Sequence, residues 1–285
     1  MKRTLSLLLA LTLLYALLAG CAGRSHCPPT PDNGDSVVDE SAVVRCRVVS
    51  ANEDGTMLLA GMNTGNPDIY TLDTLDTDEL TADVQLAVGD LVEVRCGSIL
   101  ETYPARFAEV ESLTVLSDEF NDRCALYRRV LDDLWERDEG LNDGLELISV
   151  DLTATALSPA ERSAVAWSFA QLHGISMPLE LNSEQLAEQG YLSGLEGENP
   201  FPSWENGVLF TITETDEPVT FNLPSLSEGE EIPPMAAYNV KDTVCFDASK
   251  WRSALGAYGF SQCVAVQGCD GVWGDYTING GEWIS

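Results

Sequence analysis

Short runs in which apolar and polar residues alternate dominate the first half of the folded chain. Five runs follow one another: VVRCRVVS at 43–50, TMLLA at 56–60, IYTL at 69–72, LVEVRC at 91–96 and VESLTVL at 110–116. Because successive side chains of a strand point to opposite faces, runs of period two between turn residues predict strands. Gly89 stands in the turn before the fourth run, where glycine adopts a positive φ without steric cost. We therefore predict a small antiparallel β-barrel or meander over residues 43–116.

Near Ser117 the spacing of the apolar residues changes from every second position to the spacing of a helix. Apolar residues recur at intervals of three and four within Asp122–Arg137, which predicts an amphipathic helix: Tyr127, Val130, Leu131, Leu134 and Trp135. A second helix is predicted from Ser158 to His173, because Ser158 and Glu161 form a capping box with proline at the first helical position. Gly174 ends this helix. A third, short helix is predicted at Ser183–Gln189.

Strand-like runs return between and after these helices. They are LELISVDL at 145–152, GVLFTI at 207–212, VTFNL at 219–223, YNVKDTVCF at 238–246, a segment at 258–267 and VWGDYTI at 272–278. Asp270 and Gly271 form a good hairpin turn before the last run. The pattern predicts an α+β domain with an antiparallel sheet over residues 117–285. The expected fold class is therefore mixed, with a small antiparallel barrel followed by an α+β domain.

The start of the chain carries a sorting signal. Lys2 and Arg3 precede a mostly apolar run at 5–18, which is the pattern of a secretory signal peptide and is short for a membrane span. The sequence Leu-Ala-Gly-Cys at 18–21 resembles the lipobox of bacterial lipoproteins. The resemblance implies that residues 1–20 are removed and that Cys21 receives a diacylglyceryl group through its sulfur. The alternative is a conventional signal peptide with a chance cysteine.

Residues 21–42 are rich in Pro, Gly, Ser and Asp and have no apolar periodicity. This composition is typical of a disordered tether. Two or more acyl chains anchor a protein durably, because each buried methylene contributes about 0.8 kcal/mol. We therefore expect a lipid-anchored protein on the extracytoplasmic side of the cell membrane, with the anchor as its membrane contact.

Two segments of the first half carry a family resemblance. Val88–Val94 and Glu101–Phe107 are similar to the small OB-like β-barrel domain of YobA-like lipoproteins from Gram-positive bacteria. The resemblance implies an OB-like barrel at residues 43–116. That family has no established activity, so the resemblance implies a fold and a location but no reaction.

The charge of the chain excludes one class of partner. Lys and Arg number 15 against 46 Asp and Glu, which gives a net charge of −31. Such a field repels nucleic acid and other polyanions, so we expect no nucleic-acid partner. The acidic turn at Asp138–Gly144 has many oxygen donors but lacks the residue order of an EF-hand. It is interpreted as a helix stop and turn, with a calcium site as the alternative; no other cofactor is expected.

Eight cysteines in an exported chain indicate disulfides. If Cys21 is lipidated, an odd seven remain. We favour a Cys46 to Cys96 bond, since Arg45-Cys46 and Arg95-Cys96 are similar fragments of neighbouring strands. Cys124 with Cys245, or Cys245 with Cys263, are open alternatives for a further bond. With two histidines and no CxxC motif, a metal centre is not expected.

One stretch could bind an anion. Lys250, Trp251 and Arg252 are consecutive, and two cations beside an indole suit a carboxylate ligand. In the alternative interpretation, Asp247 caps a short helix, Trp251 packs in the core and the two cations pair with acids. His173 likewise has two interpretations, a favourable contact with the carbonyl end of its helix or a general base.

Known catalytic motifs are absent from the sequence: there is no GxSxG elbow, SxxK, HExxH, phosphate loop or dinucleotide fingerprint. We therefore expect a binding or accessory module of the cell envelope, more in keeping with the sequence than an enzyme, whose ligand is a protein or a small molecule. Two alternatives stay open: an envelope hydrolase whose site is assembled from distant residues, and a calcium-dependent adhesion or sensor protein.

Overall fold

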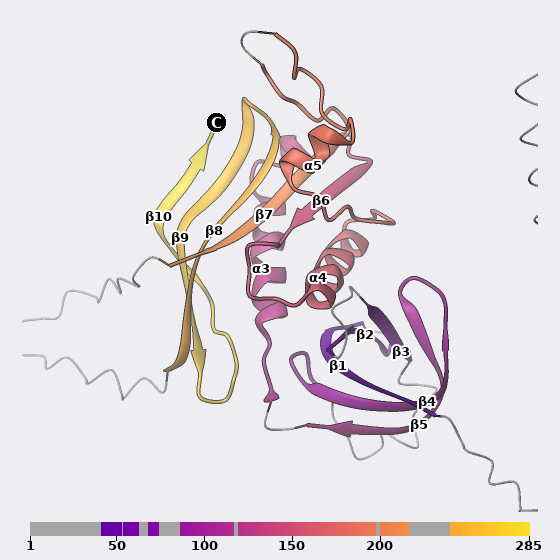
Figure 1. Ribbon diagram of the computed structural model, residues 1–285. Coiled ribbons are helices and arrows are strands. Elements are labelled where there is room, and N and C mark those ends of the chain that lie inside the picture. The colour runs from indigo at the N-terminus through magenta and orange to yellow at the C-terminus, as the bar shows by residue number, and fades with distance from the viewer. Residues whose placement is uncertain are drawn as a thin grey trace, which may run out of the picture. The chain divides into compact units, whose positions relative to one another are not determined.

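The computed structural model describes residues 41–52, 54–62, 68–73, 86–116, 119–197, 200–216 and 240–285 (Figure 1). The predicted signal peptide, Cys21, all but the last two residues of the predicted tether and the predicted strand at 219–223 lie outside the described residues. None of the helices in these ranges is both long enough and apolar enough to cross a bilayer. Contacts join residues 40–285 into one compact unit.

Five strands of the first half close into a barrel. They are β1 (Ala42–Ala51), β2 (Thr56–Gly61), β3 (Ile69–Asp73), β4 (Leu91–Leu100) and β5 (Ala105–Val115), in the order β1-β2-β3-β5-β4. The prediction of a barrel is confirmed, but one pair, β3 with β5, is parallel. An odd number of strands cannot close with every neighbouring pair antiparallel, so a five-stranded barrel must contain such a pair.

The barrel interior is filled by side chains from all five strands. Tyr70 and Phe107 stack at 4.8 Å between ring centroids, and Cys46 and Cys96 are fully buried beside them. On β1, four consecutive residues from Cys46 to Val49 are buried instead of every second one. The outward-facing residues among them are covered by a helix of the second half, so the outer face of β1 belongs to a second core.

The second half is built around a five-stranded sheet. Its elements are α3 (Arg123–Glu136), the 3-10 helix η3 (Glu139–Asn142), β6 (Leu147–Asp151), α4 (Pro159–Leu172), α5 (Ser183–Glu188), β7 (Gly207–Thr215), β8 (Val240–Ser253), β9 (Gly256–Gly268) and β10 (Thr277–Ile284). The strand order is β10-β9-β8-β7-β6. The neighbours are antiparallel except β6 and β7, which are parallel because α4 and α5 carry the chain across between them. The prediction of an antiparallel sheet is therefore wrong at this edge.

Helix α4 is the central element of the packing. Ser158 and Glu161 form the predicted capping box, and Gly174 has the positive φ of a helix stop. Buried side chains surround the helix, as expected when a helix has packing partners on all sides. Its partners are α3 and β6 on one side and the barrel strands β1, β2 and β3 on the other (Figure 1).

Two local predictions near the C-terminus are wrong. The segment after Asp247 is not a short helix, because β8 and β9 run through it as a long hairpin. The Asp247 carboxylate instead accepts a hydrogen bond from the Gln262 N–H of the facing strand at 2.7 Å. The strand predicted at 272–278 begins only at Thr277, because the Trp273 N–H donates to Asp122 Oδ1 at the start of α3.

Candidate functional site

The acidic turn after α3 and the Lys250–Arg252 stretch of β8 lie together in the structure. Lys250 Nζ donates to the carbonyls of Trp135 and Asp138 and to Asn142 Oδ1, at 3.1–3.3 Å. Arg252 donates to carbonyls of the same turn through its guanidinium, with Leu141 O at 3.1 Å. The two cations therefore hold the acidic turn after α3 by its backbone oxygens.

Lys250 is fully buried, and its ammonium lies where the carbonyl end of α3 needs a positive charge. Burial lowers the pKa of Lys250 from 10.5 to about 8, while Asp138 and Glu139 act in the opposite direction. This ammonium contacts oxygens of the turn that was the alternative calcium site. Across the described ranges, no cluster of three or more His, Cys, Asp or Glu side chains could hold a metal ion.

Trp251 does not share a surface with its two neighbours. It pairs with Leu209 on the opposite face of the sheet and packs against the small core around Trp204 and Leu186. Successive strand residues alternate in direction, so an indole flanked by two cations in sequence is separated from both in space. The three residues of the predicted anion site are therefore not brought together.

Cys46 and Cys96 are on neighbouring strands, as predicted, but out of register. Cys46 faces Val92 and Cys96 faces Ala42, so four positions separate them along the ladder, about 13 Å at the usual rise. A disulfide needs Cα atoms about 4.4–6.8 Å apart, and the two cysteines are not joined. Neither of the alternative pairings, Cys124 with Cys245 or Cys245 with Cys263, is formed.

His173 is the C-cap of α4, at the carbonyl end of the helix as predicted. Its ring stacks on Trp135 at 3.8 Å, and its Nε2 lies 3.6 Å from Asp132 Oδ1. The same carboxylate oxygen accepts a hydrogen bond from Arg128 at 3.1 Å. The histidine side chain is only 13% exposed. Its surroundings are those of a packed residue between an indole and an ion pair.

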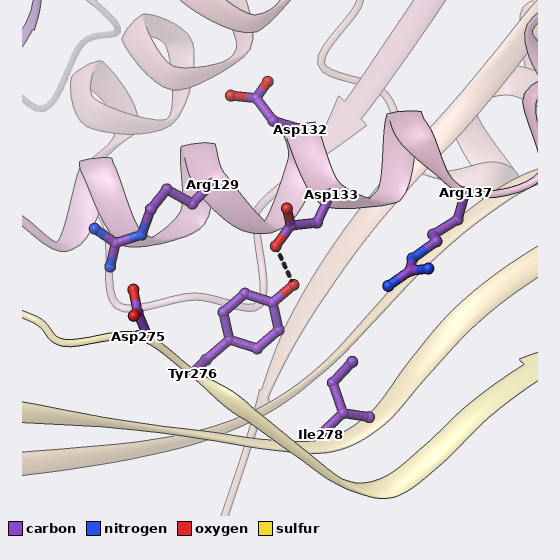
Figure 2. A pocket seen from close by; sticks show the side chains of 7 residues that line it. All are labelled: Arg129, Asp132, Asp133, Arg137, Asp275, Tyr276 and Ile278. Carbon is purple, nitrogen blue, oxygen red and sulfur yellow. Dashed lines mark hydrogen bonds between the residues drawn. The ribbon is translucent and has the colours of Figure 1, made fainter.

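A pocket of about 510 Å³ opens between α3 and the start of β10. It is lined by Arg129, Asp132, Asp133, Arg137, Asp275, Tyr276 and Ile278 (Figure 2). Arg129 and Asp133 lie one turn apart on one side of α3, and Arg137 follows four positions later as the C-cap residue of the helix. Figure 2 shows Arg129 and Asp275 pointing toward each other at one end and Arg137 with Ile278 at the other.

The polar side chains of this pocket differ in how many hydrogen bonds they already make within the protein. Arg129 Nη2 donates to the carbonyls of Trp273 and Gly274, at 3.1 and 2.9 Å. The Tyr276 hydroxyl donates to Asp133 Oδ2 at 2.6 Å. Burial, and to a smaller extent this hydrogen bond, raise the pKa of the Tyr276 phenol. Tyr276 thus stays protonated and serves as a donor.

Arg137 is the more available of the two arginines in the pocket. Its Nη2 lies 3.7 Å from Glu282 Oε1, and the two side chains are 52% and 36% exposed. An exposed ion pair at this distance contributes little, about 0–1 kcal/mol, so a ligand can displace it at small cost. The pocket therefore offers an available guanidinium at one end and carboxylates along its middle and other end.

This pocket was not predicted from the sequence. Its signal in the sequence was the row of charges at positions 129, 133 and 137, within and just after α3, away from the apolar residues that predicted the helix. Asp275 and Tyr276 are far away in sequence, and only the fold brings them there. No family model, no curated protein and no solved structure matches this chain.

Proposed function

We propose that this chain is a lipid-anchored binding protein of the cell envelope, held at the extracytoplasmic face of the membrane through Cys21. The lipobox-like sequence at 18–21 supports the anchor, and the Pro- and Ser-rich stretch after it supports a tether. The strand order β1-β2-β3-β5-β4 with a parallel β3–β5 pair supports the OB-like type of barrel.

The anchor is tested by fractionating cells that express the full chain. Cys21→Ser should release the protein from the membrane fraction, because the acylated sulfur is lost. Cys27→Ser, six residues further on, is the matched control and should stay bound. If Cys21→Ser also stays in the membrane fraction, the anchor is refuted.

The pocket between α3 and β10 supports the binding of a small dipolar ligand, such as a free α-amino acid. One observation carries this proposal: Asp133 of α3 and Arg137, the C-cap residue four positions later, offer opposite charges to one hollow (Figure 2). Tyr276 takes Asp133 Oδ2, which leaves Oδ1 for an ammonium group. Arg137 can take the carboxylate through charge-assisted hydrogen bonds. Ile278 and the Tyr276 ring supply an apolar wall for a side chain.

Four related probes separate the two charges of the ligand. Leucine carries both, N-acetyl-leucine keeps only the carboxylate, leucinamide keeps only the ammonium, and N-acetyl-leucinamide has neither. Calorimetric titration of the full chain in detergent should show leucine binding at least about tenfold more tightly than each analogue, a difference of about 1.4 kcal/mol. The proposal fails if no probe saturates by about 10 mM, or if the uncharged analogue binds as well as leucine.

Two variants assign each charge to its residue. Arg137→Gln should weaken the binding of leucine and N-acetyl-leucine but leave the binding of leucinamide unchanged. Asp133→Asn should weaken the binding of leucine and leucinamide but leave that of N-acetyl-leucine unchanged. Arg95→Gln, an exposed arginine of the barrel, is the matched control and should change none of the affinities. Equal effects of Arg137→Gln on all probes would contradict the assignment.

A further inference from the structure

A second hollow lies between the barrel and α4, and its chemistry differs from that of the rest of the molecule. Its volume is about 370 Å³, within the range of small-molecule sites. The end of β1, its connection to β2 and the strands β2 and β3 form one side, and the last turns of α4 with Arg128 of α3 form the other. We refer to it as the barrel–helix groove.

The groove is electrically neutral in a very acidic chain. None of the eleven described residues that line it is Asp or Glu. Arg128 is the single charged residue among these eleven. Arg128 is neutralised by Asp132, whose Oδ1 lies 3.1 Å from Nη2, and its Nη1 donates to Ser168 Oγ at 3.1 Å. The described lining therefore carries no unpaired charge that could bind the charged group of a ligand.

Hydroxyl and amide groups alternate here with apolar surface. Asn52, Thr56 and Thr71 face the groove from the barrel, and Gln171 faces it from α4. Gln171 Nε2 already donates to the carbonyls of Ile175 and Ser176, so the amide oxygen is what this residue offers to a ligand.

Trp167 supplies an aromatic surface in the same groove. Its ring is fixed by an edge contact with Tyr103 of the β4–β5 connection, at 5.3 Å and 83°. Leu58 is buried at the base, and Leu172, 63% exposed, extends the apolar surface to the rim. An indole beside neutral hydrogen-bonding groups complements a sugar ring, which has apolar C–H faces and a hydroxylated edge.

The geometry points to a binding site for a neutral sugar ring in the barrel–helix groove. This site is independent of the pocket between α3 and β10 and goes beyond the proposed function. The ring would lie against Trp167, with its hydroxyls toward Asn52, Thr71 and the Gln171 oxygen. A charged sugar gains nothing from the lining and loses hydration on entry, so neutral sugars are selected.

The test is titration of the full chain in detergent with N,N′-diacetylchitobiose, maltose and mannobiose, with glucosamine and glucuronate as charged probes. We expect saturable binding of at least one neutral disaccharide and none of the charged sugars by about 10 mM. Retention on insoluble chitin distinguishes a glycan chain from a soluble saccharide as the source of the ring. Absence of saturation with all three neutral disaccharides overturns the proposal.

Leu172→Arg places a long, charged side chain at the rim of the groove, and its high exposure keeps the fold intact. This variant should lower the affinity for the disaccharide at least about tenfold. Leu255→Arg, at a leucine that is 76% exposed in the β8–β9 turn, is the matched control and should bind unchanged. Equal affinities of both variants and the wild type would overturn the site. Leucine binding should be unaffected by either variant, which separates this test from that of the other pocket.

Discussion

Arg47 of the barrel and Glu161 of α4 form an ion pair in the interior, with Nε 3.7 Å from Oε1 and side chains 8% and 10% exposed. Arg47 Nη1 donates to the carbonyls of Gly89, at 3.0 Å, and of Glu119. Glu161 Oε2 accepts from the Ser158 N–H at the start of α4. Arg47 Nε has no hydrogen-bond partner and depends on the charge of Glu161. The pair therefore links the barrel to α4 by charge within an apolar contact.

Glu161→Gln should destabilise the chain by about 3 kcal/mol, because it leaves the guanidinium of Arg47 buried without its counter-charge. Glutamine can still accept the hydrogen bond from the Ser158 N–H, so the loss isolates the charge from the helix cap. Urea denaturation measures the difference in free energy of unfolding. The control is Glu93→Gln, since the Arg45–Glu93 pair is 49% and 37% exposed and should contribute less than about 1 kcal/mol. Similar losses in the two variants would refute a special role for the interior pair.

The Cys124 thiol reports on the same contact. It is fully buried, and burial raises its pKa well above 9.0, with Glu161 adding to the rise and Arg47 opposing it. A thiol reagent should label exposed Cys269 quickly and Cys124 only when the structure opens. Glu161→Gln should speed the labelling of Cys124 more than that of Cys46 inside the barrel, as followed by peptide mass spectrometry. Equal acceleration at both cysteines would indicate global unfolding instead of local separation.

Features fixed by neighbouring residues could be predicted from the sequence. The capping box at Ser158, the stop at Gly174 and the periodicity of α3 each depend on a few adjacent positions, and all three are confirmed. The parallel β3–β5 pair depends instead on closing five strands, which no single run encodes. The same limit explains Trp251, whose consecutive cationic neighbours point to the other face of the sheet.

The candidate pocket could be predicted only in part. The charges of α3 are visible in the sequence, but Asp275 and Tyr276 reach them because Trp273 is bound to the start of α3 by hydrogen bonds across 151 and 152 positions. The burial of Lys250 could not be predicted from the sequence either, because a lysine in a strand is usually a surface residue. Long-range contacts, not local propensities, create both features.

Gly89 adopts φ +101° in the turn before β4, as the sequence predicted. A Cβ there would lie 2.8 Å from both the Asp122 Cβ and the Phe120 ring. Gly89→Ala should therefore cost about 1–2 kcal/mol for the backbone and about 1–3 kcal/mol more for the clash. Gly190→Ala is the control, because Gly190 has φ +78° and nothing lies within 4 Å of its Cβ position. Thermal denaturation should show the larger loss at Gly89; equal losses would show that the turn relaxes freely.

Lys250 gives the chain an unusual response to alkali. Its pKa is lowered to about 8 in the folded chain against an ordinary value of 10.5, with burial as the main cause. Between these two values the unfolded chain binds more protons than the folded chain, so the contribution of Lys250 to stability rises with pH. Below about pH 8 both states carry the charge, and this contribution is constant. The ammonium is thus a cost to folding that is relieved as pH rises through the folded pKa.

Lys250→Met removes this titration while keeping an unbranched side chain in the buried position. The free energy of unfolding of the wild type, measured relative to the variant, should therefore be higher at about pH 9.5 than at about pH 7. Because all other groups are common to both proteins, their titrations cancel in this difference. Lys241→Met, at an exposed lysine of β8, is the matched control for replacing a lysine by methionine on the same strand. A difference for Lys250→Met that falls with pH would mean that the capping bonds to Trp135 and Asp138 outweigh the cost of burying the charge, which would reverse the sign expected here.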